Sequence, residues 1–177
     1  TALHKPCLIH SKIKQLPLSY VSAFVSISDF VTMEHQRWGV FGANELARTT
    51  TVWNPLASEI KQYTGETQFR KQLRLGFLGR LVPDKGIGYL IDELALLGNR
   101  DKWSLSVGGV SPNGDGWLRE KANGLPIDFM GWVNPSDFIR DIDVLIVPSL
   151  WNEPFGLTVI EGLLAGKIVL GSHKGAI

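Results

Sequence analysis

Apolar and polar positions follow two alternating rhythms in the second part of this chain. Short apolar runs predict buried strands, and the stretches between them repeat apolar residues every three or four positions, which is the spacing of a helix face. The predicted strands cover residues 73–78, 103–107, 127–130, 144–147 and 168–170, and the predicted helices cover 87–97, 115–123, 135–140 and 157–165. Strands that alternate with helices of about ten residues indicate right-handed βαβ crossovers. We therefore expect an α/β fold built on a parallel sheet.

The first part of the chain has a different pattern. Residues 20–28 alternate β-branched or aromatic residues with serine and alanine, which predicts a strand, and residues 47–53 predict another. Between them, residues 30–38 have the pattern of a short helix, with an N-cap at Ser28. These elements indicate a structural unit that is separate from the regular α/β pattern.

A polar stretch separates the two patterns. Residues 57–71 are poor in branched aliphatic side chains. Such a shift in composition is typical of a boundary between structural units. We expect a first unit at residues 1–58, a linker at 59–72 and an α/β domain at 73–177.

The composition narrows the functions that this fold can have. The 177 residues are 44% hydrophobic and 20% charged, as in an ordinary globular chain. With 18 basic and 17 acidic residues the formal net charge is +1, so no basic surface for nucleic acid is expected. Cys7 is the single cysteine, which excludes an intramolecular disulfide and a cysteine metal cluster and fits a reducing, cytosolic compartment. No apolar run reaches the ~18 residues of a transmembrane helix.

Two cations flank the first junction between a strand and a helix in the α/β pattern. Gly79-Arg80 follows the strand, and Lys85-Gly86 opens the helix. Glycine lets the backbone approach a ligand, a helix N-terminus carries partial positive charge, and an arginine can grip two phosphate oxygens at once. Either these residues bind a phosphate, or they are surface charges that flank a turn, with Asp84 paired to one of them.

Two acidic residues follow the fourth predicted strand. Glu153 lies in the loop after it and Glu161 in the second turn of the next predicted helix, so both are near the end of the strand where open α/β sheets bind ligands. Their carboxylates can accept hydrogen bonds from sugar and ribose hydroxyls, while free amides around Phe155 to Thr158 can hold a phosphate. With the two cations, they indicate a nucleotide-sugar site. The alternative is that Glu161 is a helix-surface residue and Glu153 a solvated loop residue.

Two further motifs have competing interpretations. Asp141-Ile142-Asp143 resembles the DxD metal motif of some sugar transferases, but its place before a buried strand favours a helix cap or a strand start. Nothing nearby completes the roughly six oxygen ligands of a hard cation, so we expect no metal site. Gly108-Gly109 is either a loop that approaches a ligand closely or a simple turn.

Three linked segments resemble a known family. They are FLGRLVPDKGIGYLIDEL at residues 77–94, PSLWNEPFGLTVIEGLLAG at 148–166 and GSHKGAI at 171–177. Their order, with Glu153 and Glu161 separated by seven residues, resembles the C-terminal donor-binding half of the retaining GT-B glycosyltransferases, specifically glycosyltransferase family four. The resemblance implies a Rossmann-like open parallel sheet with helices on both faces.

The resemblance extends upstream more loosely. Residues 25–31 and 51–57 are similar to the end of the family's N-terminal acceptor domain, which implies that residues 1–58 are a remnant of that domain. The sequence also lacks an initial methionine. We therefore expect a truncated piece of a longer polypeptide, incomplete at its C-terminus and inactive alone.

The family's site residues correspond to positions of this sequence. By that similarity Arg80, Lys85 and Glu153 are the catalytic residues: the two cations neutralise the donor diphosphate and stabilise the leaving group, and Glu153 orients the donor sugar. Glu161 is implied to hold the ribose. The remaining implied contacts are the backbone of Trp132 and Val133 around the base, and the amides of Gly156, Leu157 and Thr158.

The resemblance implies an enzyme that transfers a hexosyl group from a nucleoside-diphosphate sugar to a glycan or lipid-linked acceptor. The anomeric configuration would be retained, and neither a metal nor another cofactor would be needed. The expected setting is polysaccharide or lipopolysaccharide assembly in the cytoplasm, or at the inner face of the membrane through regions that the chain lacks. Two alternatives stay open: a sugar-nucleotide epimerase of GT-B fold and a non-catalytic nucleotide-binding α/β module.

Overall fold

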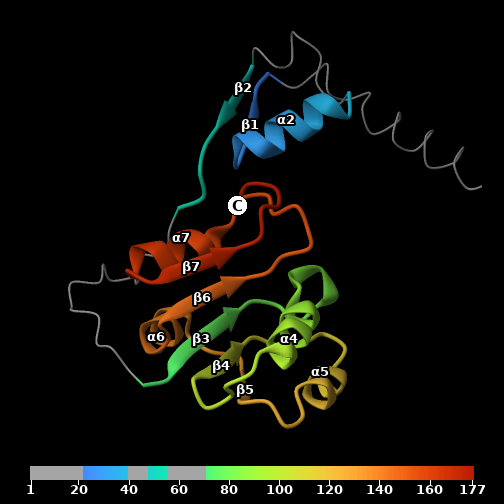
Figure 1. The fold of residues 1–177 in the computed structure, drawn as a ribbon. Coiled ribbons are helices and arrows are strands. Elements are labelled where there is room, and N and C mark those ends of the chain that lie inside the picture. Colours follow the sequence, from blue (N-terminus) through green and yellow to red (C-terminus); the bar gives the residue numbers. More distant parts are fainter. Residues whose placement is uncertain (1–21, 40–47, 56–70) are drawn as a thin grey trace, which may run out of the picture. The chain divides into compact units, whose positions relative to one another are not determined.

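The computed structural model of the chain describes residues 22–39, 48–55 and 71–177 (Figure 1). The chain divides into two compact units, Thr1–Asn54 and Pro55–Ile177. Cys7 and nearly all of the expected linker lie outside the described residues.

The first unit contains a parallel pair of short strands and a helix. Strand β1 (Phe24–Ser26) pairs with β2 (Thr49–Thr51), and α2 (Asp29–Arg37) lies between them in the chain. The Ser28 side chain accepts a hydrogen bond from the Val31 amide at 3.2 Å, so the predicted N-cap is confirmed. Both strands lie within the ranges that the sequence predicts for them.

The described residues of the second unit form a five-stranded parallel sheet with four helices. Its strands are β3 (Leu73–Leu78), β4 (Trp103–Gly108), β5 (Ile127–Gly131), β6 (Val144–Val147) and β7 (Ile168–Gly171). Its helices are α4 (Ile87–Leu96), α5 (Gly116–Lys121), α6 (Pro135–Asp141) and α7 (Leu157–Leu164), with a short 3-10 turn, η2 (Pro83–Lys85). The strand order is β5-β4-β3-β6-β7 and every pairing is parallel, which confirms the expected α/β fold.

The strand order reverses at β3. From β3 the chain moves outward through β4 to β5, and then returns to the other side of β3 to form β6 and β7. The loops after β3 and β6 therefore diverge from neighbouring strand ends. In open α/β sheets such a point is where a crevice for ligands forms.

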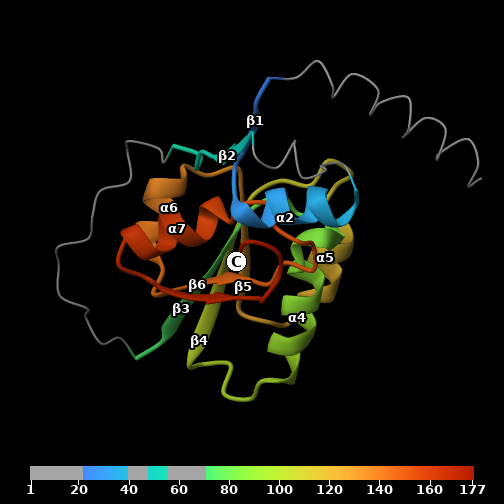
Figure 2. The same cartoon turned by 90° about the horizontal axis from the view of Figure 1, so that it is seen from above.

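Helices cover both faces of the sheet. Figures 1 and 2 show α4 and α5 on one side of the strands and α6 and α7 on the other. The first face buries Phe77 of β3 against Ile87 and Ile91 of α4, and the second buries Leu145 of β6 against Phe138 of α6. A strand that is covered on both faces has few positions for polar side chains, which explains the unbroken apolar sequence of β6.

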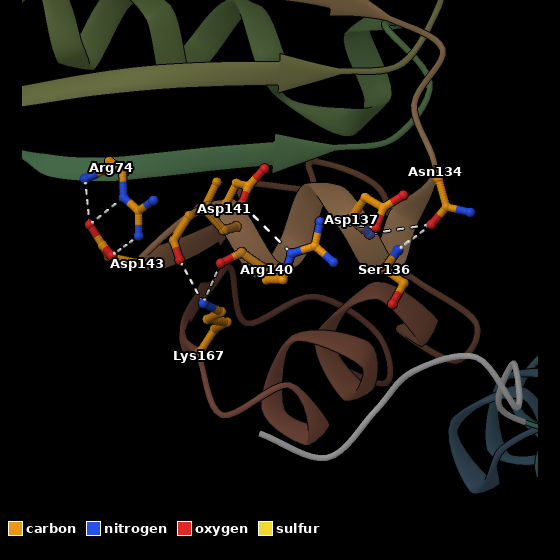
Figure 3. Close-up of polar contacts among 9 residues, drawn as sticks. Arg74, Asn134, Ser136, Asp137, Arg140, Asp141, Asp143 and Lys167 are labelled. Carbon is orange, nitrogen blue, oxygen red and sulfur yellow. Dashed lines mark hydrogen bonds and ion pairs between the residues drawn. The ribbon is translucent and has the colours of Figure 1, made fainter. Parts of the chain in front are cut away.

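Helix α6 is fixed at both ends (Figure 3). At its start the Asn134 side chain accepts a hydrogen bond from the Ser136 amide at 2.9 Å. At its end the Lys167 ammonium donates to the carbonyl oxygens of Arg140 and Ile142, each at 2.9 Å. These contacts satisfy terminal backbone groups that the helix itself cannot pair, so α6 is held firmly on its face of the sheet.

Among the described residues, no helix combines the length and apolar character that crossing a membrane requires.

Candidate functional site

The loop after β3 carries Lys85 to the edge of the sheet where the strand order reverses. Lys85 ends η2, and Gly86 follows it in the left-handed conformation with φ 73°. A Cβ at Gly86 would collide with the backbone carbonyl of Pro148, directly after β6. Only glycine permits both this conformation and this contact, so Gly86 brings the loops after β3 and β6 together.

The loop after β6 is attached to η2 by its backbone. The amides of Leu150 and Trp151 donate hydrogen bonds to the Asp84 carbonyl oxygen at 2.9 Å and 3.1 Å. Their side chains remain exposed, at 56% and 55%. The backbone of this loop, rather than its side chains, therefore fixes its position beside Lys85.

Glu153 and Lys85 form an ion pair at this junction. The Lys85 ammonium lies 2.5 Å from Oε1 of Glu153, and the Ser149 hydroxyl donates to the same oxygen at 2.7 Å. Glu153 is 8% exposed and Ser149 only 1%. The interpretation of Glu153 as a solvated loop residue is therefore wrong, and Lys85 pairs with Glu153 and not with Asp84.

A third loop, after β7, packs against the backbone of Glu153. The Ala176 amide donates to the Glu153 carbonyl oxygen at 2.8 Å, and Gly175 forms an isolated parallel bridge with Glu153. Gly175 has φ 70°, and a Cβ there would collide with the Glu153 backbone. Three loops from three neighbouring strands thus converge on one acidic residue.

Glu161 is the second buried acid. It lies in the second turn of α7 and is 8% exposed, so its interpretation as a helix-surface residue is wrong. Burial disfavours the charged form and raises the pKa of its carboxyl above the ordinary value. No described residue forms a recorded hydrogen bond or ion pair with this carboxylate. A largely buried acid with a raised pKa is common at functional sites.

The amino end of α7 is open. Gly156 takes the N-cap position with φ 76° and has no side chain to cap the helix. The first helical bonds are donated by Val159 and Ile160 to the Gly156 carbonyl. The amides of Leu157 and Thr158 precede them and have no acceptor within the helix. These amides are free to donate to an anion, and the phosphate contact that the sequence indicates stays a prediction.

The other predicted site residues lie apart from this cluster. Arg80 is exposed, two residues after β3, and its side chain has no recorded bond to a described residue. Trp132 is 77% exposed and follows β5, at the edge of the sheet. Val133 packs over Gly108, because a Cβ at Gly108 would lie 2.7 Å from its side chain. The structure therefore joins Lys85 and Glu153 but records no contact of Arg80, Trp132 or Val133 with them.

Sequence reasoning missed Ser149, Ser172 and Gly175. Ser149 and its neighbour Ser172 fasten the loops after β6 and β7, since the Ser172 hydroxyl donates to the Ser149 carbonyl at 2.6 Å. The sequence contains a weak indication for Ser149, because this serine closely follows the entirely apolar strand β6, at the end where ligands bind.

The acidic motif before β6, Asp141-Ile142-Asp143, has a structural role in the sheet. Asp143 accepts two hydrogen bonds from the Arg74 guanidinium, at 2.6 Å and 3.2 Å, and one from the Arg74 amide at 2.9 Å (Figure 3). Asp141 is exposed and lies 3.8 Å from Arg140. Asp143 thus joins β6 to β3 at their amino ends, on the edge opposite to Glu153, as the strand-start interpretation predicts.

Gly108-Gly109 also has a structural role. A Cβ at Gly109 would collide with the carbonyl of Gly79, so these glycines let the loops after β3 and β4 touch each other. Among the described residues, no group of three or more His, Cys, Asp and Glu side chains could hold a metal ion.

A parallel sheet with a cation, carboxylates and an open helix start at its point of reversal has the arrangement in which α/β proteins bind ligands. Residues 72–177 match the family model described as Glycosyl transferases group 1, and the chain belongs to this family. The fold is that of one half of the GT-B glycosyltransferases, with helices on both faces of the sheet as expected.

Individual relatives agree with the family. An uncharacterized 42.6 kDa protein in the cps region of Klebsiella pneumoniae is 31% identical over 89% of this chain and 40% of its own length. A GDP-mannose-dependent alpha-(1-6)-phosphatidylinositol dimannoside mannosyltransferase of Mycobacterium tuberculosis is 28% identical over 76% of this chain and 38% of its own. The chain thus spans about two fifths of the length of these curated relatives.

Among solved structures, HepE of Anabaena in complex with UDP has the same fold. Its TM-score is 0.76 at 20% sequence identity, over 91% of this chain and 47% of that one.

Proposed function

We propose that this chain is the donor-binding part of a retaining hexosyltransferase that uses a nucleoside-diphosphate sugar. The observation that carries the proposal is the convergence of Lys85, Glu153 and the open start of α7 at the reversal of the strand order. Membership of the glycosyltransferase family favours sugar transfer over the epimerase alternative.

In this proposal the cations act on the diphosphate. Lys85 already lies at the junction of the two loops, and its ammonium has three donors, so it can bind a phosphate oxygen as well as Glu153. Arg80 follows the same strand and is exposed, so its side chain can turn toward the ligand. Both would stabilise the negative charge that develops on the leaving diphosphate in the transition state.

The two acids act on hydroxyl groups. Glu153 accepts hydrogen bonds from the donor sugar, and Glu161 accepts them from the ribose diol. The amides of Gly156, Leu157 and Thr158 hold phosphate oxygens, and the backbone of Trp132 and Val133 frames the base. A sugar hydroxyl would supply the donor that the buried Glu161 carboxylate lacks among the described residues, which supports this assignment.

The acceptor and the setting belong to the same proposal. We infer a glycan or lipid-linked acceptor, because one relative is named for a lipid-linked mannoside acceptor and another for its place in a cps region. The family resemblance described above implies three further properties of the reaction. The anomeric configuration is retained, the reaction takes place in the cytoplasm or at the inner face of the membrane, and no metal ion is required.

Calorimetric titration tests the donor site. The chain is titrated with UDP-glucose, GDP-mannose and ADP-glucose, each with and without EDTA. We expect it to bind at least one donor, with the same affinity in EDTA. Arg80→Ala and Glu161→Ala should each weaken binding about tenfold or more, since each removes a charged hydrogen-bonding partner.

Lys102→Ala is the matched control. Lys102 is exposed and precedes β4, at the edge of the sheet opposite to Glu153, so its loss should leave donor affinity unchanged. Equal effects of all three substitutions would point to nonspecific attraction of the nucleotide. Tight binding that neither Arg80→Ala nor Glu161→Ala disturbs would refute the assigned site.

A further inference from the structure

Ser149 is the most deeply buried polar residue at the candidate site. Its side chain is 1% exposed, and its hydroxyl lies 2.7 Å from Oε1 of Glu153. The same hydroxyl lies 3.2 Å from the Trp151 carbonyl and 3.4 Å from the Asp84 carbonyl. We propose that Ser149 is a positioning residue, which holds one oxygen of Glu153 so that the other is presented to a hydroxyl of the donor sugar.

The chemistry of these neighbours determines where the serine proton goes. A hydroxyl has one hydrogen to donate, and all three neighbouring oxygens are acceptors. The Glu153 carboxylate is the nearest acceptor and the only charged one, so it takes the strongest of the three hydrogen bonds. Ser149 therefore acts mainly on Glu153.

The two oxygens of Glu153 are in different situations. Oε1 accepts from both Lys85 and Ser149. No described residue donates a recorded hydrogen bond to Oε2. A carboxylate that is held by one oxygen has a defined orientation, and its second oxygen remains an acceptor for a ligand hydroxyl.

Lys85 and Ser149 differ in how firmly they hold Oε1. Lys85 has a long flexible side chain, and in the proposed function its charge is drawn to the donor diphosphate. Ser149 has a short side chain near the end of β6, and its carbonyl is fixed by the Ser172 hydroxyl at 2.6 Å. A neutral hydroxyl is not attracted to the diphosphate, so Ser149 continues to orient Glu153 when the donor binds.

This inference rests on the proposed donor site and predicts a specific split in affinity. Ser149 acts on the residue that contacts the sugar and not on those that contact the nucleotide. Its loss should therefore weaken binding of a nucleotide sugar and leave binding of the matching nucleoside diphosphate unchanged.

The test compares three ligand pairs by calorimetry: UDP with UDP-glucose, GDP with GDP-mannose, and ADP with ADP-glucose. For the pair that the unmodified chain binds, Ser149→Ala should reduce the affinity gained from the sugar on the order of tenfold, because a hydrogen bond to a charged acceptor is lost. Ser149→Cys, which keeps nearly the same size but donates weakly, should give a smaller loss in the same direction and covers the case of a poorly folding Ala variant.

Two controls separate positioning from a general structural role. Ser104→Ala removes a hydroxyl near the amino end of β4, on the edge of the sheet opposite to Glu153, so it should leave the sugar-dependent affinity unchanged. In a Glu153→Gln background, Ser149→Ala should cause little further loss, since the two residues act as one unit.

Three outcomes would overturn the inference. One is an equal loss for the diphosphate and the sugar nucleotide in Ser149→Ala, another is no loss for either, and the third is a full additional loss in the Glu153→Gln background. If the unmodified chain bound none of the six ligands, the proposed function itself would fall. That result differs from the first three, in which the donor site stands and only the role of Ser149 is lost.

Discussion

At the scale of single residues, Glu161 is a residue of the candidate site whose burial is unfavourable for the stability of the fold. An acid at 8% exposure with a raised pKa lowers the stability of the fold when it is charged. An amide or an apolar side chain would suit α7 better. The proposed role of Glu161 as an acceptor for ligand hydroxyls would account for a carboxylate in this position.

The pH dependence of Glu161→Gln measures this cost. Because the pKa of Glu161 is higher in the folded state than in the unfolded chain, the folded state binds more protons between the two values. The favourable contribution is complete below the unfolded value of about 4.3 and is lost as pH rises through the folded pKa. The glutamine side chain of the variant stays neutral, so the variant should gain stability relative to the unmodified chain as pH increases.

Urea denaturation from pH 4 to pH 8 tests this expectation. The difference in the free energy of unfolding between variant and unmodified chain should be smallest at pH 4 and should reach its largest value above the folded pKa of Glu161. A difference that stays constant over this range would show that burial does not perturb the Glu161 carboxyl.

The charged residues of the candidate site could be predicted from the sequence, but the residues that hold them in position could not. Lys85 and Glu153 stand out because they are charged residues in the loops that follow buried strands, at the end of the sheet where ligands bind. Ser149 does not stand out, because a serine after a strand is common. Its role depends on the turn of the chain that places the Glu153 carboxylate beside its hydroxyl. Such contacts depend on loop geometry, which periodicity does not encode.

At the scale of elements, the strands were easier to predict than the helices. The bounds of β3 and β6 agree with the predicted ranges because their sequences are mainly apolar and are followed by Gly79 and Pro148. The helix expected to reach Leu97 ends one residue earlier, and Leu97 has an extended backbone and is 51% exposed. The apolar spacing of the sequence therefore extends one residue beyond the end of the helix.

Asp143 links the start of β6 to Arg74 of β3, which gives a prediction at this scale. Asp143→Ala should lower the free energy of unfolding by about 1–3 kcal/mol, since Arg74 loses a bidentate partner that is only partly exposed. Asp141→Ala should change it by less than about 0.5 kcal/mol, because that side chain is 75% exposed.

Chemical denaturation of the two variants side by side gives the measurement. Repeating it with Mn²⁺ and with EDTA tests the metal interpretation of this motif, because a metal bound to both aspartates would stabilise the unmodified chain and neither variant. Equal effects of the two substitutions would show that Asp143 has no special role at the strand start.

At the scale of the whole chain, the described parts of the two units differ in how much apolar surface they bury. All buried hydrophobic residues of the described chain belong to the second unit, in which β3, β4 and β6 supply the centre of the core. In the first unit, the buried side chains among the described residues are Ser26 and Ser28. The described part of the first unit, a two-stranded pair with a helix, should therefore open more easily than the sheet of the second unit.

Hydrogen exchange followed by mass spectrometry tests this difference. Amides of β1, β2 and α2 should exchange well before those of β3, β4 and β6, because opening of the first unit requires little apolar surface to be exposed. Matched protection in the two units would mean that they unfold as one cooperative body.

The final prediction concerns what the chain can do with a bound donor. Sugar transfer requires an acceptor held at the anomeric carbon and a site from which water is excluded. In the proposed function the loops after β3, β6 and β7 supply groups for the donor alone, and the chain spans about two fifths of the length of its curated relatives. We therefore expect the chain to bind a nucleotide sugar in calorimetry but to transfer no sugar to glycan or lipid-linked acceptors. Donor consumption followed by chromatography is the measurement, with the acceptor omitted as control. Acceptor-dependent consumption by this chain alone would show that it holds a complete catalytic site, and would contradict the assignment of its loops to the donor.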